Sequence, residues 1–207
     1  MFINELAEKL YFQFSTRSIK DRPLIVGIDG LSGAGKTTLV KKIEQELNDN
    51  NCEVVTFHLD DHIVERNKRY QTGHEEWYEY YYLQWDIKRL TTHLFELLHT
   101  SCNKIFLPFY DKSTDSTSTK QITVASDSIV LIEGIFLQRQ EWRRFYDFII
   151  FLDCPRELRY KRSLNRDSYI GNYPARLNKY KRRYWLAEKH YLDIVKPVRN
   201  ADLVYNA

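Results

Sequence analysis

The chain has 207 residues, of which 43% are hydrophobic and 29% are charged, and its formal net charge is +3. This composition is that of an ordinary globular domain, and so mild a charge does not by itself indicate nucleic-acid binding. No apolar run approaches the length of a membrane span, and charged residues interrupt the N-terminal apolar pattern, which argues against a signal peptide. We expect a soluble, cytoplasmic protein without a membrane partner.

Along the chain, apolar residues recur in two patterns: at helical spacing, and in short continuous runs. Helical spacing predicts an N-terminal helix within residues 1–20, a second helix after Thr37, a long one over residues 83–97 and another after Pro155. Short, continuously apolar runs predict strands buried on both faces. These runs are RPLIVGID, CEVVTFHL, SIVLIEG, FYDFIIFLD and ADLVYN.

A further pair of predicted strands, KIFLPFY and KQITV, flanks the polar segment DKSTDSTST and indicates a hairpin. Strands that alternate with helices predict an α/β structure in which helices cover both faces of a parallel sheet. We expect one domain over residues 1–207. The three cysteines, Cys52, Cys102 and Cys154, are odd in number and lack a C-x-x-C pair, so we expect buried free thiols.

A glycine-rich segment, GLSGAGKT, joins the first predicted strand to the second predicted helix. It fits the pattern G-x-x-x-x-G-K-[ST], in which backbone N–H groups wrap around phosphate oxygens at a helix N-terminus. Lys36 then lies near the β- and γ-phosphates, and the Thr37 hydroxyl can bind Mg²⁺. The predicted nucleotide-binding residues are Gly30, Leu31, Ser32, Gly33, Ala34, Gly35, Lys36, Thr37 and Thr38.

The sequence lacks the N-K-x-D motif with which a GTPase normally reads its base. Asn103-Lys104 is followed by Ile-Phe, and Asn178-Lys179 is followed by Tyr-Lys. The pattern therefore favours an ATPase or a kinase of small molecules.

Carboxylates follow two of the predicted strands. Asp60 and Asp61 end the second strand, and Glu133 ends SIVLIEG. Chemistry in open α/β sheets lies beyond the carboxyl ends of the strands, so we favour Asp60 over Asp61 as general base or metal support. Glu133 is a candidate for holding Mg²⁺ through water. The alternatives are a helix cap for either aspartate and a simple turn at Glu133.

Residues 156–183 contain ten Lys or Arg but only two acidic residues. Arg159, Arg162 and Arg166 are spaced to share one helix face. Arginines stabilise the charge that phosphoryl transfer develops, so we favour a basic lid over residues 155–185, with a solvated face or RNA binding as alternatives. The aromatic segment WYEYYYLQW, residues 77–85, is explained equally well by stacking on a flat substrate and by packing.

The ordered set GIDGLSGAGKTTL, LDDHI, LPFYD, LIEGIF, Arg162–Asp167 and ADLVYNA resembles the uridine kinase and phosphoribulokinase-like family from about Pro23 to the C-terminus. The resemblance implies a P-loop NTPase fold, three layers α/β/α, with a hairpin and a helical lid. It also implies ATP-dependent, Mg²⁺-dependent phosphorylation of a hydroxyl on a small, nucleoside-like acceptor.

The resemblance assigns roles to particular residues. It implies that Asp60 is the general base, that Thr37 and Glu133 support the metal, and that Arg162 and Arg166 are lid arginines. Together with the chemistry of the motifs, this leads us to expect Lys36, Arg162 and Arg166 to be catalytic and Asp60 to join the metal site. The resemblance also implies that Tyr110 borders the acceptor, and we expect the acceptor-binding residues to be Asp60, Tyr110, Asp86 and Glu133.

The chain departs from the family around the acceptor. His62-Ile63 replaces an aromatic pair, the nucleoside-binding F-D-H-P stretch is not recognisable, and KSTDSTST follows Tyr110-Asp111 where uridine kinases have histidine and arginine. We therefore keep a kinase of a non-nucleoside metabolite such as a vitamin precursor as an alternative, beside a nucleotide-dependent RNA-associated ATPase or switch. A homo-oligomer is left open.

Overall fold

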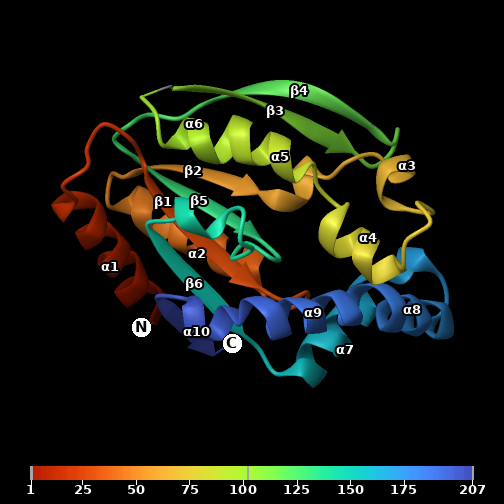
Figure 1. Ribbon diagram of the computed structural model, residues 1–207. Helices are drawn as coiled ribbons and strands as arrows, with labels where there is room; N and C mark the ends of the chain where they lie inside the picture. Colours follow the sequence, from red (N-terminus) through yellow and green to blue (C-terminus); the bar gives the residue numbers. More distant parts are fainter. Residues whose placement is uncertain (1, 102, 207) are drawn as a thin grey trace.

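A five-stranded parallel sheet forms the centre of the molecule in the computed structural model, which describes residues 2–101 and 103–206 (Figure 1). Cys102 therefore lies outside the described residues, whereas Cys52 and Cys154 are buried free thiols, as expected. The strands, in their spatial order, are β2 (Glu53–His58), β5 (Ser128–Gly134), β1 (Leu24–Gly30), β6 (Phe148–Asp153) and β7 (Leu203–Asn206). Each is parallel to its neighbours, and every residue of β1 and β5 is buried.

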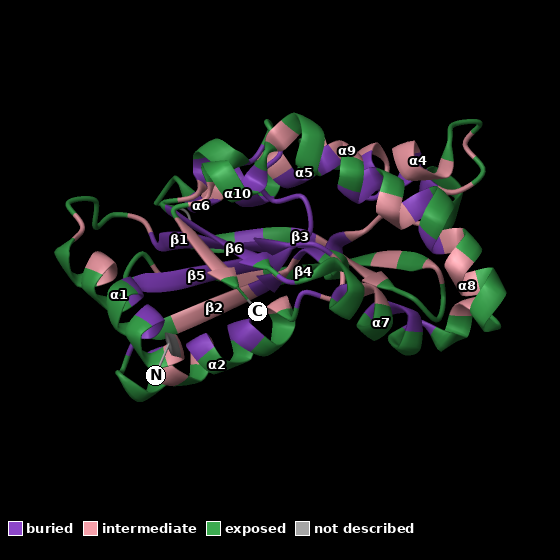
Figure 2. Cartoon of the chain, turned by 90° about the horizontal axis from the view of Figure 1, so that it is seen from below, coloured by how far each residue is buried: buried purple, intermediate pink, exposed green. Residues whose placement is uncertain are grey.

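Helices cover both faces of the sheet, which gives the predicted three layers. Alternate residues of β1 point to opposite faces, because side chains alternate along a strand: Val26 packs with α1 (Phe2–Thr16) and α2 (Lys36–Asp49), and Ile25 packs with the other layer. That second layer contains α5 (Ile87–Leu90), α6 (Glu96–Leu98) and α9 (Trp185–Val195). Figure 2 shows the buried strands enclosed between these more exposed helices.

The predicted hairpin is present as a separate antiparallel sheet. It pairs β3 (Lys104–Asp111) with β4 (Ser116–Thr123), from Lys104↔Thr123 to Asp111↔Ser116. The second strand begins earlier than KQITV, at Ser116, so the last four residues of the polar segment belong to it and only residues 112–115 turn. Ile105 and Leu107 are fully buried in the core beside α5 and α6.

Two predicted helices have different bounds. The N-terminal helix ends at Thr16, before residue 20. The helix expected over 83–97 begins at Ile87, because Leu83 instead follows α4 (Glu76–Tyr82), and it contains a π-helical turn at Thr91–Phe95 before ending at Leu98. The hydroxyls of Thr91 and Thr92 donate to carbonyls one turn back, a competition that often perturbs helices.

The predicted lid region begins as helix α7 (Arg156–Arg166) after Pro155 and continues through a 3₁₀ turn (Ser168–Ile170), α8 (Tyr173–Lys179) and a π turn (Tyr180–Tyr184) into α9. Tyr180 and Arg183 are buried, so its last part is anchored to the body. The shorter elements are the 3₁₀ turns Leu59–His62 and Arg143–Phe145, α3 (Arg66–Arg69) and α10 (Pro197–Asn200). None of the helices in the described ranges has the length and apolar character that crossing a membrane needs.

Candidate active site

The glycine-rich segment forms the turn between β1 and α2, as its motif predicts. Gly33 and Gly35 have φ angles of 78° and 100°, a backbone region that favours glycine. A Cβ on Gly33 would lie 2.6 Å from the Arg159 carbonyl oxygen and the Ser163 hydroxyl, whereas no atom lies within 4 Å of the Cβ position at Gly35. The turn therefore packs against α7 at Gly33 and is open at Gly35, a shape that fits a phosphate group.

The other motif residues hold this turn in place or line it. Leu31 and Ala34 are buried, and Thr38 lies in the first turn of α2. Lys36 Nζ donates to the carbonyl oxygens of Gly30 (2.9 Å) and Leu31 (3.3 Å), so its charge lies over the turn. A phosphate there would meet both the ammonium and the N-terminus of α2.

Thr37 and Glu133 lie side by side because β1 and β5 are adjacent strands. The Thr37 hydroxyl donates to Glu133 Oε1 (2.9 Å), and His58 Nδ1 lies 2.8 Å from the same oxygen. Burial would raise the pKa of Glu133, but the hydrogen bond from His58, the charge of Lys36 and the Thr37 hydroxyl lower it below its ordinary value. The same contact raises the pKa of His58. Glu133 is thus held as a carboxylate.

This arrangement fits a magnesium ion that also binds phosphate. A hydroxyl and a carboxylate are the oxygen ligands that Mg²⁺ takes in proteins, usually together with water and substrate phosphates. In the described part of the chain, no group of three or more His, Cys, Asp or Glu could hold a metal by itself. Sequence reasoning did not identify His58, although its position two residues before Asp60 in FHLDD was a signal.

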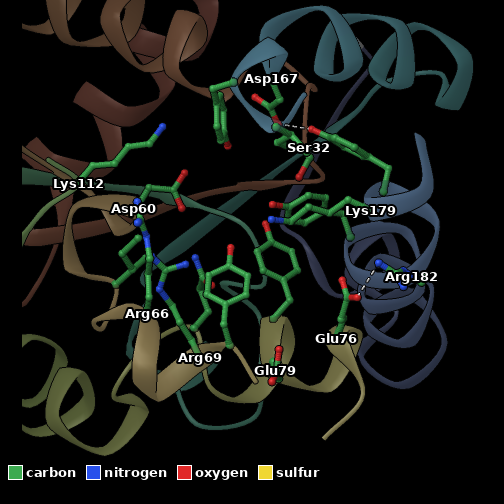
Figure 3. A pocket seen from close by; sticks show the side chains of 18 of the residues that line it. Ser32, Asp60, Arg66, Arg69, Glu76, Glu79, Lys112, Asp167, Lys179 and Arg182 are labelled. Atoms are coloured by element: carbon green, nitrogen blue, oxygen red, sulfur yellow. Dashed lines mark hydrogen bonds and ion pairs between the residues drawn. The ribbon is translucent and has the colours of Figure 1, made fainter. Parts of the chain in front are cut away.

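Asp60 lies in the 3₁₀ turn after β2, on the wall of a cavity of about 1020 Å³ that also contains Ser32 of the glycine-rich turn (Figure 3). The residue as a whole is exposed, but the protein around its carboxyl group removes much of the hydration there and raises the pKa of Asp60. Glu133 and Asp61 act in the same direction, while Lys36 and Arg166 oppose them. Asp61 does not line this cavity.

The two expected lid arginines lie near these groups. Arg162 Nη1 is 3.5 Å from the Gly33 carbonyl oxygen, and Arg166 lines the cavity and donates to Asp167 Oδ1 (2.7 Å). The prediction that Arg159 shares an exposed lid face with Arg162 and Arg166 is wrong. Arg159 is buried and forms an ion pair with Glu188 (3.0 Å), because this side of α7 packs against the body rather than facing solvent.

That buried pair supports the turn. Glu188 Oε1 accepts from the Ser32 amide (3.0 Å), and Arg159 Nη1 donates to the Ser32 carbonyl (3.3 Å). Glu188 lies on α9 and Arg159 on α7, so two helices hold the backbone amide and carbonyl of one residue of the phosphate-binding turn. Nothing in the sequence pattern distinguished Glu188 from a solvated residue.

Asp29 is a second support that the sequence did not reveal. It is fully buried in β1 and accepts from the Gly30 amide (2.8 Å), the Gln138 side chain (3.0 Å) and the Tyr191 hydroxyl (2.5 Å). Burial raises the pKa of this carboxyl, although these hydrogen bonds oppose the shift. Asp29 thus joins the end of β1 to the segment after β5 and to α9.

We expect Asp29→Ala to lower the free energy of unfolding by about 2–4 kcal/mol, because it leaves three buried donors without an acceptor. Urea unfolding at pH 7 measures this change, with exposed Asp21→Ala as the matched control. Equal stabilities of the two variants would show that Asp29 is not a structural support.

The remaining predicted acceptor residues separate into two groups. Tyr110 lines the cavity, and its hydroxyl donates to Asp115 (2.8 Å). Asp86 is exposed, does not line the cavity and caps α5 by accepting from the Arg89 amide (2.9 Å). We therefore do not carry Asp86 into the proposed site.

The aromatic segment 77–85 mainly packs. Tyr80 lines the cavity, whereas Tyr81 and Trp85 are buried around Phe136, with ring centroids 4.9 and 6.4 Å from it. Most of this segment therefore builds the wall behind the cavity.

The family model described as "Phosphoribulokinase / Uridine kinase family" matches residues 25–204. The chain belongs to this family. A uridine kinase from Lactobacillus helveticus is 27% identical over 191 residues, which cover 86% of this chain and 87% of that protein. One from Halalkalibacterium halodurans is 27% identical over 189 residues, covering 85% and 86%. The expected family and its P-loop kinase fold are thus confirmed.

Solved structures agree on the fold. "A Possible Uridine Kinase from Bacillus stearothermophilus" is 41% identical, covers 100% of both chains and superposes with a TM-score of 0.79. A D-glycerate 3-kinase from Cryptococcus neoformans, 13% identical, covers 97% of this chain and 88% of that chain with a TM-score of 0.59, and shows the fold alone.

Proposed function

We propose that this member of the family is an ATP-dependent, Mg²⁺-dependent kinase that phosphorylates a hydroxyl of a small acceptor. The observation that carries the proposal is the shared cavity: Asp60, a carboxylate able to accept a proton, faces the same space as Ser32 of the phosphate-binding turn. The relatives named uridine kinase support a nucleoside-like acceptor. We place the activity in the cytoplasm, where ATP is available.

Bound MgATP would supply the phosphoryl group, and this chain's side chains would position and stabilise it. The acceptor oxygen forms a bond to the γ-phosphorus, the bond from that phosphorus to ADP breaks, and Asp60 takes the hydroxyl proton. Lys36, Arg162 and Arg166 would stabilise the negative charge on the transferring group. Thr37 and Glu133 would hold the metal, and the lid region would exclude water that competes as nucleophile.

A non-nucleoside acceptor is the second candidate, because the F-D-H-P stretch is not recognisable and the cavity wall is rich in cationic side chains. An RNA-dependent ATPase receives less support. Arg159 and Arg183 of the basic stretch are buried in ion pairs with Glu188 and Glu79, so they are withdrawn from any surface that could bind RNA.

An acceptor screen with coupled ADP detection tests the proposal. Purified protein with MgATP should release ADP only when an alcohol such as a nucleoside, a vitamin precursor or a sugar derivative is added. ADP release that needs RNA and falls steeply with salt would instead identify the RNA-dependent alternative.

The pH profile gives a separate prediction. Asp60 must be ionised to act as base, and its pKa is raised, so activity falls as the pH decreases through a value above the ordinary aspartate pKa of about 3.9. We expect the acidic limb of kcat/KM to lie above the ordinary aspartate range, with folding followed by fluorescence across the same pH range. Undiminished kcat/KM down to pH 4 in folded protein would contradict the role of Asp60.

A further inference from the structure

The cavity wall carries more positive charge than its own acids neutralise. Three of its four acidic residues already have partners: Glu76 pairs with Arg182 (3.0 Å), Glu79 with Arg183 (3.1 Å), and Asp167 with Arg166 (2.7 Å). The fourth is Asp60, the proposed base. Within the described ranges, three cationic residues of the wall make no ion pair with a carboxylate within 4.0 Å. They are Arg69, Lys112 and Lys179.

Arg69 is the most constrained of these cations. It ends the short helix α3, is only 5% exposed, and donates from Nε to the Val64 carbonyl oxygen (2.7 Å). Its guanidinium carbon lies 4.9 Å from the Tyr70 ring centroid and 5.2 Å from that of Tyr110. Burying a guanidinium without a counter-charge is costly, because hydration is lost and no attraction replaces it.

The neighbouring carboxylate at the hairpin turn, Asp115, attracts Arg69 only at longer range: the Arg69 charge helps to lower the pKa of Asp115, but the two side chains form no ion pair within 4.0 Å. Asp115 accepts from the Tyr110 hydroxyl (2.8 Å) and the Arg66 amide (3.0 Å), and its ion-pair contact is with Arg66 at 4.0 Å. Arg183, whose guanidinium carbon lies 4.0 Å from the Tyr70 ring centroid, is neutralised by Glu79. Among the described residues, Arg69 is therefore a fixed cation on the cavity wall with no carboxylate in direct contact.

The pKa of the Tyr70 phenol reflects the cationic side chains around it. Burial acts to raise its pKa, yet the charges of Arg183, Lys179 and Arg69 outweigh that effect and lower it. Lys179 lies 5.0 Å from the Tyr70 ring centroid, and Lys112 lies 3.7 Å from that of Tyr169 in the lid region. The positive field thus extends from Arg69 across this side of the cavity.

Arg69 is separate from the groups assigned to the nucleotide phosphates. In the view of Figure 3, Ser32 and Arg69 enter the cavity from opposite sides, with Asp60 to one side between them. Lys36 and Arg162 contact the glycine-rich turn itself. A molecule that reaches from Asp60 toward Arg69 therefore extends away from the phosphate-binding turn, as an acceptor would.

We propose that the acceptor alcohol carries an anionic group, a carboxylate or a phosphate monoester, which Arg69 binds on the side of the cavity away from the phosphate-binding turn. This inference rests on the proposed kinase function, because it assigns the cavity to the acceptor. Lys112 and Lys179 contribute to the attraction at the cavity rim. A neutral nucleoside leaves Arg69 without an anion in direct contact.

Kinetics with three acceptor classes test the inference. Neutral, carboxylate-bearing and phosphate-bearing alcohols are compared, for example ribitol, ribonate and ribitol 5-phosphate beside uridine. We expect an anionic class to have the highest kcat/KM, and Arg69→Gln to lower it about 10- to 100-fold, mainly through KM. Arg69→Lys should recover part of this loss. Lys68→Gln removes the same charge from an exposed position of α3 that pairs with Glu65, and should change kcat/KM less than about threefold.

A binding measurement separates this inference from the kinase proposal. Inorganic phosphate and acetate are titrated by calorimetry at constant ionic strength, with a non-hydrolysable ATP analogue and Mg²⁺ occupying the phosphate-binding turn. Wild-type protein and Lys68→Gln should bind one of the two anions at least about tenfold more tightly than Arg69→Gln, and the anion that binds identifies the class. A neutral acceptor preferred by wild type, or anion binding independent of Arg69, would overturn the inference. Failure of every alcohol to release ADP would instead count against the kinase function.

Discussion

We expect Asp60→Asn to lower kcat by about 100- to 10,000-fold, the range that a positioned general base contributes. The amide cannot take the hydroxyl proton, although it has nearly the same size as the carboxylate. The affinity for MgATP should change little, because Asp60 lies on the cavity wall and not within the phosphate-binding turn. Steady-state kinetics and nucleotide titration measure the two effects separately.

Asp61→Asn is the matched control for this substitution. Asp61 is the next residue, is exposed and does not line the cavity, so its variant removes the same charge without removing the base. We expect its kcat within about threefold of wild type. Equal losses in the two variants would mean that negative charge in this turn, rather than proton transfer by Asp60, supports the reaction.

Lys36→Ala should weaken nucleotide binding by at least about 10- to 100-fold, because a charged hydrogen-bond donor to phosphate is lost. Its loss should lower kcat as well, since the same charge stabilises the transferring group. The Lys36 ammonium is held over the turn by two carbonyl oxygens, at 2.9 and 3.3 Å, so it is already positioned where phosphate oxygens would lie. Titration with a fluorescent ATP analogue measures the change.

Lys42→Ala tests whether this effect is specific. Lys42 lies on the exposed face of the same helix, α2, and carries the same charge. Its variant should bind nucleotide like the wild type. Nucleotide affinity that survives Lys36→Ala unchanged would place the phosphate site elsewhere.

The sheet, the hairpin and the phosphate-binding turn could be predicted because each has a local signal. Continuous apolar runs of the kind in β1 and β5 occur where both faces of a strand are buried, and G-x-x-x-x-G-K-T requires its glycines for backbone reasons. Asp60 could be singled out from its place two residues after β2, because chemistry lies beyond the carboxyl ends of such strands. These inferences needed no knowledge of distant contacts.

The supports of the turn could not be predicted, because they depend on residues far apart in the sequence. Glu188 contacts Ser32, and Asp29 contacts Tyr191, only after α9 has packed beside the sheet. For the same reason the sequence predicts that Arg159 lies on an exposed face of the lid helix, which is wrong. Helical spacing correctly placed it near Arg162 and Arg166, but only the packing of α7 shows which side of the helix is buried.

Arg69 shows a different limit of sequence reasoning. In the sequence it is one of several basic residues in ERNKRY, and neither its burial nor its lack of a carboxylate partner can be read there. The family resemblance covers the catalytic residues. Around the acceptor, however, the sequence differs from the family pattern, so the resemblance predicts no residue for this part of the cavity. The charge balance of the folded wall is what indicates an anionic acceptor.

The central claim is that the turn at residues 30–37 binds the ATP phosphates while Asp60 takes the proton of the acceptor hydroxyl that attacks the γ-phosphorus. A crystal structure with Mg²⁺ and a non-hydrolysable ATP analogue tests it most directly. We predict that the phosphates lie on the backbone amides of this turn, with the γ-group facing Asp60 across a gap that admits one hydroxyl. Phosphates bound elsewhere, or a γ-group with no path to Asp60, would contradict the account.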